Sequence, residues 1–247
     1  MKMKSLIIVF CVVFLTVNNL YAASMEKLNA RIERSHNYLK EIMETPDTAV
    51  PSYLLKKCQG VIIIRQYKAG FIFGVKGGKG VALKKDKVTG KWSAPSFVTS
   101  GEGSFGLQIG GQAIDAVLLI MNKSGVESLL KVKCKLGVDA SIATGPVGRD
   151  MEAKIGADTA FLVYAKAKGL YGGLSFEGGI MTQDNRSNEK FYAKEVTVKE
   201  IFNNEVELPD SAKELVVSLT KYSSEEVSDE KQQDGGNKES KKSKESK

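Results

Sequence analysis

Histidine, tryptophan, cysteine and proline are all scarce in this sequence. The 247 residues include one histidine, one tryptophan, three cysteines and five prolines. Because His36 is the single histidine, a histidine-rich metal site cannot form, and any catalytic triad would depend on that one side chain. Three cysteines are too few for a disulfide framework or a four-cysteine zinc site. The sequence therefore predicts neither a metal nor another cofactor.

The N-terminus has the form of a secretory signal peptide. Lys2 and Lys4 precede an apolar run that starts at Ser5, and the small residues Ala22 and Ala23 follow it. The run is shorter than the roughly 20 residues of a membrane-spanning helix. We therefore expect residues 1–22 to be a cleaved signal and the protein to be exported to the periplasm or cell envelope. An uncleaved N-terminal anchor is the alternative.

Residues 223–247 form a charged segment of low complexity. Val227 is their one aliphatic residue and they contain no aromatic residue, so the segment cannot bury enough surface to fold. Its acidic residues come first and its lysines last. We expect a disordered tail, which either keeps the protein soluble or tethers it through lysines to an anionic partner.

Glycine is concentrated in the middle of the chain. Of the 24 glycines, 22 lie between Gly60 and Gly179, where they interrupt short apolar runs. Glycine within a strand marks a bend, a bulge or a close approach of two backbones. The pattern predicts an α+β fold with a glycine-rich, strongly bent, barrel-like antiparallel sheet, flanked by short helices and preceded by an N-terminal amphipathic helix. Residues 25–222 would form this domain.

The helices are predicted from their apolar spacing. The first spans residues 25–44, and T45-P-D-T-A-V-P ends it; Pro51 suits the first turn of a second helix that stops at Gly60. Residues 86–90 read as a hairpin turn. The remaining helices are expected over 124–131, 188–193, 197–202 and 210–222.

Two glycine motifs invite a nucleotide-binding interpretation. G101-E-G-S-F-G fits the dinucleotide pattern G-x-G-x-x-G, but glycines follow it where the motif requires a helix. G74-V-K-G-G-K-G is one residue short of a phosphate-binding loop. We interpret the second as a basic glycine hairpin, whose lysines are either solvated or present themselves to an anion.

Other chemically active residues have ordinary structural explanations. His36 lies at the edge of the apolar stripe of the first helix, where a half-buried packing role is expected. Asp115, Asp139, Asp158 and Glu177 lie in or beside apolar runs, where carboxylates commonly accept hydrogen bonds from backbone N–H groups. Cys58 and Cys134 are either a disulfide or two buried free thiols. No motif of an enzyme stands out.

A series of motifs resembles the SYLF domain family, also labelled the Ysc-type actin-binding domain. They include W92-S-A-P, G103-S-F-G-L-Q-I-G and G145-P-V-G-R, and the similarity runs from about Pro51 to Tyr222. The resemblance implies a mixed sheet-and-helix domain that binds anionic lipid, including phosphoinositides, and associates with actin in eukaryotic members. An exported chain would be a bacterial-type member, for which actin is not an expected partner.

A basic excess favours an anionic partner. The formal charge is +7, and the excess persists when the two lysines of the predicted signal are removed. Nucleic acid is the weakest of the anionic candidates, because an exported protein seldom meets it and no reader motif occurs, so we expect it not to be a partner. We therefore predict a non-enzymatic lipid-binding domain of the cell envelope, which contacts anionic phospholipid at the membrane surface. The alternative is a structural or protein-interaction module with an envelope protein as its partner.

Five residues are candidates for the lipid contact. Lys27, Arg31 and Arg34 accompany the apolar stripe of the first helix (Leu28, Ile32, Leu39 and Ile42), which would itself enter the membrane surface. Lys76 and Lys79 on the glycine hairpin form a second candidate site. The alternative for the helix is that its stripe packs on the domain.

Trp92 and Pro95 are predicted to be structural. The tryptophan is expected to be buried, with Gly103 and Gly106 packed closely beside it.

Overall fold

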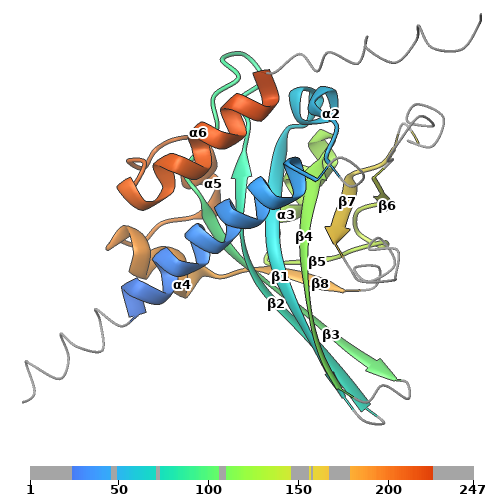
Figure 1. The fold of residues 1–247 in the computed structure, drawn as a ribbon. Coiled ribbons are helices and arrows are strands. Elements are labelled where there is room, and N and C mark those ends of the chain that lie inside the picture. Colours follow the sequence, from blue (N-terminus) through green and yellow to red (C-terminus); the bar gives the residue numbers. More distant parts are fainter. Residues whose placement is uncertain are drawn as a thin grey trace, which may run out of the picture.

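The computed structural model describes residues 24–45, 49–70, 73–105, 110–145, 156, 158–166 and 179–224. The predicted signal peptide and nearly all of the predicted tail lie outside these residues. The first described element is a helix over residues 24–43, here called the N-terminal helix, which carries no label in Figure 1. No helix among the described residues has the length and hydropathy to cross a membrane.

One curled sheet of eight strands forms the centre of the described domain (Figure 1). The strand order is β5-β8-β3-β2-β1-β4-β7-β6, and every pairing is antiparallel except that of β6 with β7. The strands are β1 (Gly60–Gly70), β2 (Phe73–Lys84), β3 (Ser96–Phe105), β4 (Gly110–Ile120), β5 (Lys133–Lys135), β6 (Ile142–Thr144), β7 (Phe161–Lys166) and β8 (Ile180–Gln183). The predicted α+β class and bent sheet are confirmed.

Within the described ranges, five further helices accompany the sheet: α2 (Ser52–Lys57), α3 (Lys123–Leu130), α4 (Asn185–Tyr192), α5 (Val198–Phe202) and α6 (Asp210–Ser224). Side-chain caps explain where three of them begin. Asn122 caps α3, Asp184 caps α4, and Thr197 forms a capping box with Glu200 at α5. Pro51 is the N-cap of α2, whereas the sequence analysis placed it in the first turn of that helix.

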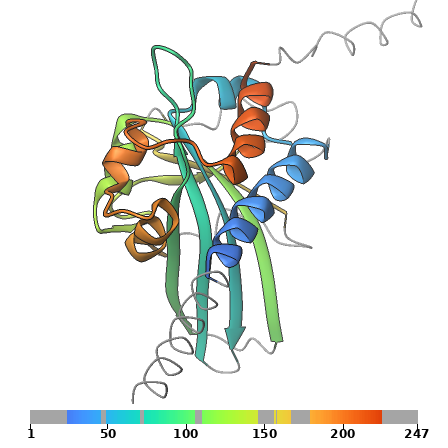
Figure 2. The same cartoon turned by 90° about the vertical axis from the view of Figure 1, so that its left-hand side faces the viewer.

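Apolar side chains cover both faces of the sheet. The first face carries Val61, Ile63 and Val81, and it packs against the N-terminal helix, α2, α4 and α6. The second face carries Ile62 and Ile64, and it packs against α3 and α5. Figures 1 and 2 show that the ends of β1–β4 farthest from α2 extend past these helices. The helices thus cover the sheet only part of the way along its longest strands.

Close approaches explain part of the glycine content. A Cβ atom at Gly80 would collide with the carbonyl oxygen of Ile63 and lie 2.7 Å from Ile64 Cα on β1. One at Gly78 would meet the Ser100 hydroxyl of β3. Both glycines lie within β2, which pairs with β1 on one side and with β3 on the other. The prediction of a hairpin at residues 74–80 is therefore wrong.

The described part of G101-E-G-S-F-G also belongs to a strand, because residues 101–105 continue β3. A dinucleotide motif needs a turn that leads into a helix, so this geometry opposes that interpretation.

Trp92 is buried as predicted, with 5% of its surface exposed. Its backbone forms an isolated antiparallel β-bridge with Lys85, and residues 86–90 form the turn between them. The predicted hairpin turn is therefore also confirmed. Gly103 pairs with Val75 near the opposite end of β2, so the expectation that it packs beside the tryptophan is wrong. Gly106 lies outside the described residues. Strand pairing, which a local motif does not reveal, separates the glycine from the ring.

Cys58 and Cys134 are free, buried thiols. Cys58 belongs to the core on the first face of the sheet and Cys134 to the core on the second. The sheet therefore lies between them, and the alternative of a disulfide is excluded.

Candidate functional site

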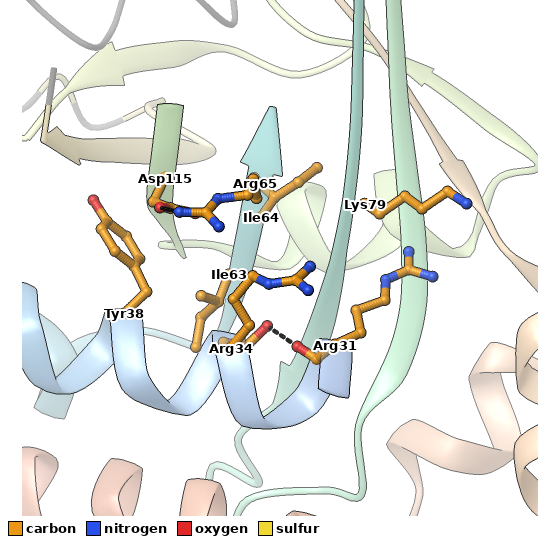
Figure 3. A pocket seen from close by; sticks show the side chains of 9 residues that line it. Arg31, Arg34, Tyr38, Ile63, Ile64, Arg65, Lys79 and Asp115 are labelled. Carbon is orange, nitrogen blue, oxygen red and sulfur yellow. Dashed lines mark hydrogen bonds and ion pairs between the residues drawn. The ribbon is translucent and has the colours of Figure 1, made fainter. Parts of the chain in front are cut away.

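A cationic pocket lies between the N-terminal helix and the first face of the sheet (Figure 3). Its basic side chains come from two different parts of the chain, the helix and strands β1 and β2. The residues that line it are Arg31, Arg34, Ser35, Tyr38, Ile63, Ile64, Arg65, Lys79 and Asp115. Four basic residues and one acidic residue are thus among those that line it.

The sheet side of the pocket is set by strand register. Arg65 of β1 pairs with Lys79 of β2 on one side and with Asp115 of β4 on the other. Directly opposite residues of neighbouring strands share a face, so these three side chains form one polar row. The preceding row on that face contains Ile63 and Val81, which are buried. The pocket therefore lies where the face of the sheet changes from apolar to polar.

Arg65 is held by Asp115. Its Nη2 donates to the carboxylate Oδ2 at 2.5 Å, and about a third of the arginine side chain stays exposed. The hydrogen bond to Asp115 is the main reason why the pKa of Arg65 is raised, and burial acts against it. Asp115 thus fixes the guanidinium in place at the edge of the pocket.

Arg31 is a buried structural cation. Its Nη1 donates to Asp184 Oδ2 at 2.9 Å, its Nη2 donates to the carbonyl of Val98, and its guanidinium lies 5.1 Å from the centre of the Phe97 ring. Burial lowers the pKa of Arg31, whereas Asp184 raises it and Arg34 lowers it further. Arg31 therefore ties the N-terminal helix to β3 and to the start of α4.

Arg34 and Lys79 are the accessible cations of the pocket. Both are exposed, and neither forms an ion pair within the described part of the chain. Figure 3 shows Arg34 extending from the helix toward the strands that carry Arg65 and Lys79. Like charges gathered around one opening repel each other, and a bound anion would relieve that repulsion.

Arg31 and Arg65 each keep an unused donor. The Nε–H groups of Arg31 and Arg65 are buried and have no hydrogen-bond partner among the described residues. A buried donor without an acceptor costs free energy.

The two candidate sites predicted from sequence meet in this pocket. Arg31 and Arg34 reach it from the helix, and Lys79 reaches it from β2. Lys27 is exposed on the helix, one turn before Arg31, and does not line the pocket. Lys76 pairs with Lys68 and Glu102 in the backbone, and its side chain lies outside the described part.

Two expectations about the helix need correction. Its apolar stripe does not face solvent, because Ile32, Leu39 and Ile42 are fully buried in the core. Arg31 is not a free surface cation, because it is 6% exposed and paired with Asp184. The alternative, in which the stripe packs on the domain, is the arrangement observed.

Sequence reasoning missed Arg65 as a site residue and assigned Asp115 no partner. The sequence does contain a signal for Arg65, which is the charged residue at the end of the apolar run V61-I-I-I-R. Val61 and Ile63 lie on the same face of the strand as Arg65. Strand alternation places Arg65 on the side of the N-terminal helix. Only the pairing of three strands shows that it meets Lys79 and Asp115.

The other reactive side chains have local roles. His36 Nε2 shares a hydrogen bond of 2.8 Å with Ser218 Oγ of α6, and Asp139 accepts the backbone N–H of Lys135. No cluster of three or more histidine, cysteine, aspartate or glutamate residues suited to a metal occurs within the described ranges.

Comparison with known proteins shows similarity to one protein family. Residues 101–222 match the Ysc84 family, which is described as "Las17-binding protein actin regulator". The chain is 35% identical to Protein YSC84 of Saccharomyces cerevisiae over 175 residues, 69% of this chain and 37% of that protein. It is 29% identical to the human SH3 domain-containing YSC84-like protein 1 over 203 residues, 79% of this chain and 59% of that protein.

The Xenopus laevis protein of that name is 32% identical over 181 residues, 72% of this chain and 54% of the relative. The chain thus spans less than two thirds of the length of these relatives. No solved structure matches it.

Proposed function

Because this chain belongs to the SYLF (Ysc84) family, we propose that it is a non-enzymatic domain that binds anionic phospholipid. The cationic pocket would receive the phosphate of a lipid headgroup at the membrane surface. The family is described by binding and regulation and not by catalysis. We place the domain in the cell envelope, where export would separate it from actin and from cytosolic phosphoinositides.

The observation that carries this proposal is the meeting of Arg34 and Lys79 at one opening. They come from the helix and from β2, and both remain exposed without a carboxylate partner in the described part. Arg65, held by Asp115, adds a third, oriented guanidinium. Arginine matches phosphate through parallel hydrogen bonds, and lysine adds a compact charge.

The expected binding energy is electrostatic. A lysine or arginine near an anionic membrane surface contributes about 1 kcal/mol, and this contribution falls with salt because the Debye length shortens. Arg34, Lys79 and the exposed Lys27 would act in this way. The fully buried stripe of the N-terminal helix would contribute no apolar insertion.

Vesicle co-sedimentation tests the proposal. We expect the protein to sediment with phosphatidylglycerol-containing vesicles but not with pure phosphatidylcholine vesicles, and to be released as salt is raised. Failure to sediment with either vesicle would reject lipid binding and favour a structural or protein-interaction module. Equal binding to both would reject the electrostatic mechanism.

A further inference from the structure

An exposed row of small and apolar residues adjoins the cationic pocket. Tyr67 follows Arg65 by two residues on β1, and strand alternation therefore places it on the same face, about 7 Å farther along. The register continues this row across the neighbouring strands, from Ala113 of β4 through Tyr67 to Gly77, Gly101 and Ile180. We call these five residues the tyrosine strip.

The strip is open to solvent. Tyr67 is 53% exposed and Ile180 is 40% exposed, which makes them two of the few large apolar side chains on the described surface. Two glycines, Gly77 and Gly101, separate them across β2 and β3. The strip thus combines two apolar projections with a flat floor between them.

Packing within the domain does not require those two glycines. A Cβ atom at Gly101 would meet nothing within 4 Å, and one at Gly77 would meet only the Ser100 carbonyl oxygen at 3.9 Å. Neither glycine has a positive φ. This differs from Gly78 and Gly80, whose space is filled by neighbouring atoms. A side chain would therefore fit at both positions.

Polar groups border the strip on the side of the pocket. Lys79 and Arg65 form the adjacent row, and it continues through Thr99 and Thr182, whose hydroxyls share a hydrogen bond of 2.6 Å. The Tyr67 hydroxyl also interacts with Arg65 and helps to raise the pKa of that arginine. The polar row of cations and hydroxyls therefore lies two residues from the tyrosine strip on each of these strands.

We propose that the tyrosine strip docks on the interfacial layer of a phospholipid bilayer. Tyrosine prefers that layer because its ring is apolar and its hydroxyl is polar. With headgroup phosphates at Arg34 and Lys79, the neighbouring strip would lie against the glycerol and upper acyl region, and Tyr67 and Ile180 would enter it. This inference rests on the proposed lipid binding and assigns to it a membrane-facing surface.

Tryptophan fluorescence tests the orientation in the full chain. The native Trp92 is buried and provides a constant background. Tyr67→Trp introduces an indole in the strip, and Val88→Trp is the matched control, because Val88 is 94% exposed in the turn at the opposite end of β2. With phosphatidylglycerol-containing vesicles, Tyr67→Trp should shift to shorter wavelength and be quenched by acyl-brominated lipid, whereas Val88→Trp should not change.

The outcomes separate this inference from lipid binding itself. Sedimentation of Tyr67→Trp with no spectral change would overturn the docking surface and leave lipid binding intact. No sedimentation of the wild-type protein would overturn both. A blue shift that depends on protein concentration without vesicles would assign the strip to a second copy of the chain and overturn the inference.

A second pair of variants measures the apolar contribution. Combined Tyr67→Ser and Ile180→Ser should weaken binding about tenfold, as the loss of partly buried apolar side chains predicts, and leave its salt dependence unchanged. Arg34→Gln with Lys79→Gln should instead reduce the salt dependence. Unchanged affinity of the serine variant would contradict the docking surface.

Discussion

Arg31 of the N-terminal helix and Asp184 at the start of α4 form an ion pair of 2.9 Å, although 153 residues separate them in the chain. Asp184 also accepts the backbone N–H of Ser187 as the cap of α4. The pair joins the N-terminal helix to the start of α4, beside the Phe97 ring. Its partners are mostly buried, so it is a structural contact, and the phosphate would be met by its exposed neighbours.

Removal of the Asp184 charge should destabilise the fold. Asp184→Asn retains a capping oxygen for α4 but leaves the Arg31 guanidinium buried without its counter-ion. Breaking a buried pair in this way costs about 3–5 kcal/mol, and the partial exposure of Asp184 favours the lower end. Chemical denaturation measures the loss. Glu189→Gln on the exposed side of α4 should have no comparable effect.

The same pair predicts how stability changes in acid. Burial acts to raise the pKa of Asp184, but hydrogen bonds from Arg31 and Ser187 outweigh it, so its folded pKa is below the ordinary 3.8. The stabilisation is therefore complete above that ordinary value and is lost as the pH falls through the lower folded value. Denaturation midpoints between pH 5 and 2 should fall less steeply for Asp184→Asn than for the wild-type protein.

His36 should give a second, separate dependence on pH. Burial lowers its pKa from the ordinary 6.5, and Glu214 opposes this effect. The unfolded chain then binds a proton at a higher pH than the folded chain, so stability declines as the pH falls from 6.5 to the folded value. Because it is the single histidine, His36→Gln should abolish this slope. An unchanged slope would assign it to another group.

Trp92 should be a major contributor to stability. The residue is 5% exposed and belongs to the core on the first face of the sheet, and Lys85 Nζ lies 5.5 Å from the ring centre. Trp92→Ala should lower the free energy of unfolding by about 3–5 kcal/mol. Val88→Ala, in the adjacent turn, should change it by less than about 0.5 kcal/mol. Equal melting temperatures for the two variants would refute the assignment.

Two glycines of neighbouring strands should respond differently to alanine. Gly80→Ala would press its methyl group against the backbone of Ile63 and Ile64, which should cost about 1–3 kcal/mol. Gly101→Ala meets open space and should be neutral or slightly stabilising. Thermal unfolding of both variants distinguishes glycines that the curled sheet requires from those that it does not.

The predicted signal peptide is tested by N-terminal sequencing of protein from the extracytoplasmic fraction. The basic start and the small residues at Ala22 and Ala23 predict a mature chain that begins at Ala23 or Ser24. Intact Met1 in the membrane fraction would instead support an uncleaved anchor.

Local patterns were sufficient to predict much of the fold. The three- and four-residue spacing of Leu28, Ile32 and Leu39 identified the N-terminal helix, and the interrupted apolar runs identified a bent sheet. Both signals arise from neighbours in the chain. The direction that an apolar stripe faces depends instead on which surface covers it, so the sequence could not decide between membrane and core.

The pocket depended on long-range register. Arg65, Lys79 and Asp115 become neighbours only when β1 pairs with β2 and β4 in a single alignment, and a shift of one residue would turn Arg65 to the other face. For this reason the sequence presented Arg34 and Lys79 as parts of two competing sites. The sequence also does not show that Arg31 is buried and paired with Asp184. Because of that pair, Arg31→Glu would disrupt the fold and could not test binding alone.

Charge reversal of Arg34 and Lys79 tests the central claim most directly. Arg34→Glu with Lys79→Glu should weaken binding to phosphatidylglycerol-containing vesicles by at least about 30-fold, since two contributions of about 1 kcal/mol are lost. The control is Lys87→Glu with Lys199→Glu, which changes the net charge equally at exposed lysines of the turn at residues 86–90 and of α5. We predict near wild-type binding for the control, with both proteins folded by circular dichroism. Equal loss in the two variants, or no loss in either, would contradict phosphate binding at the pocket.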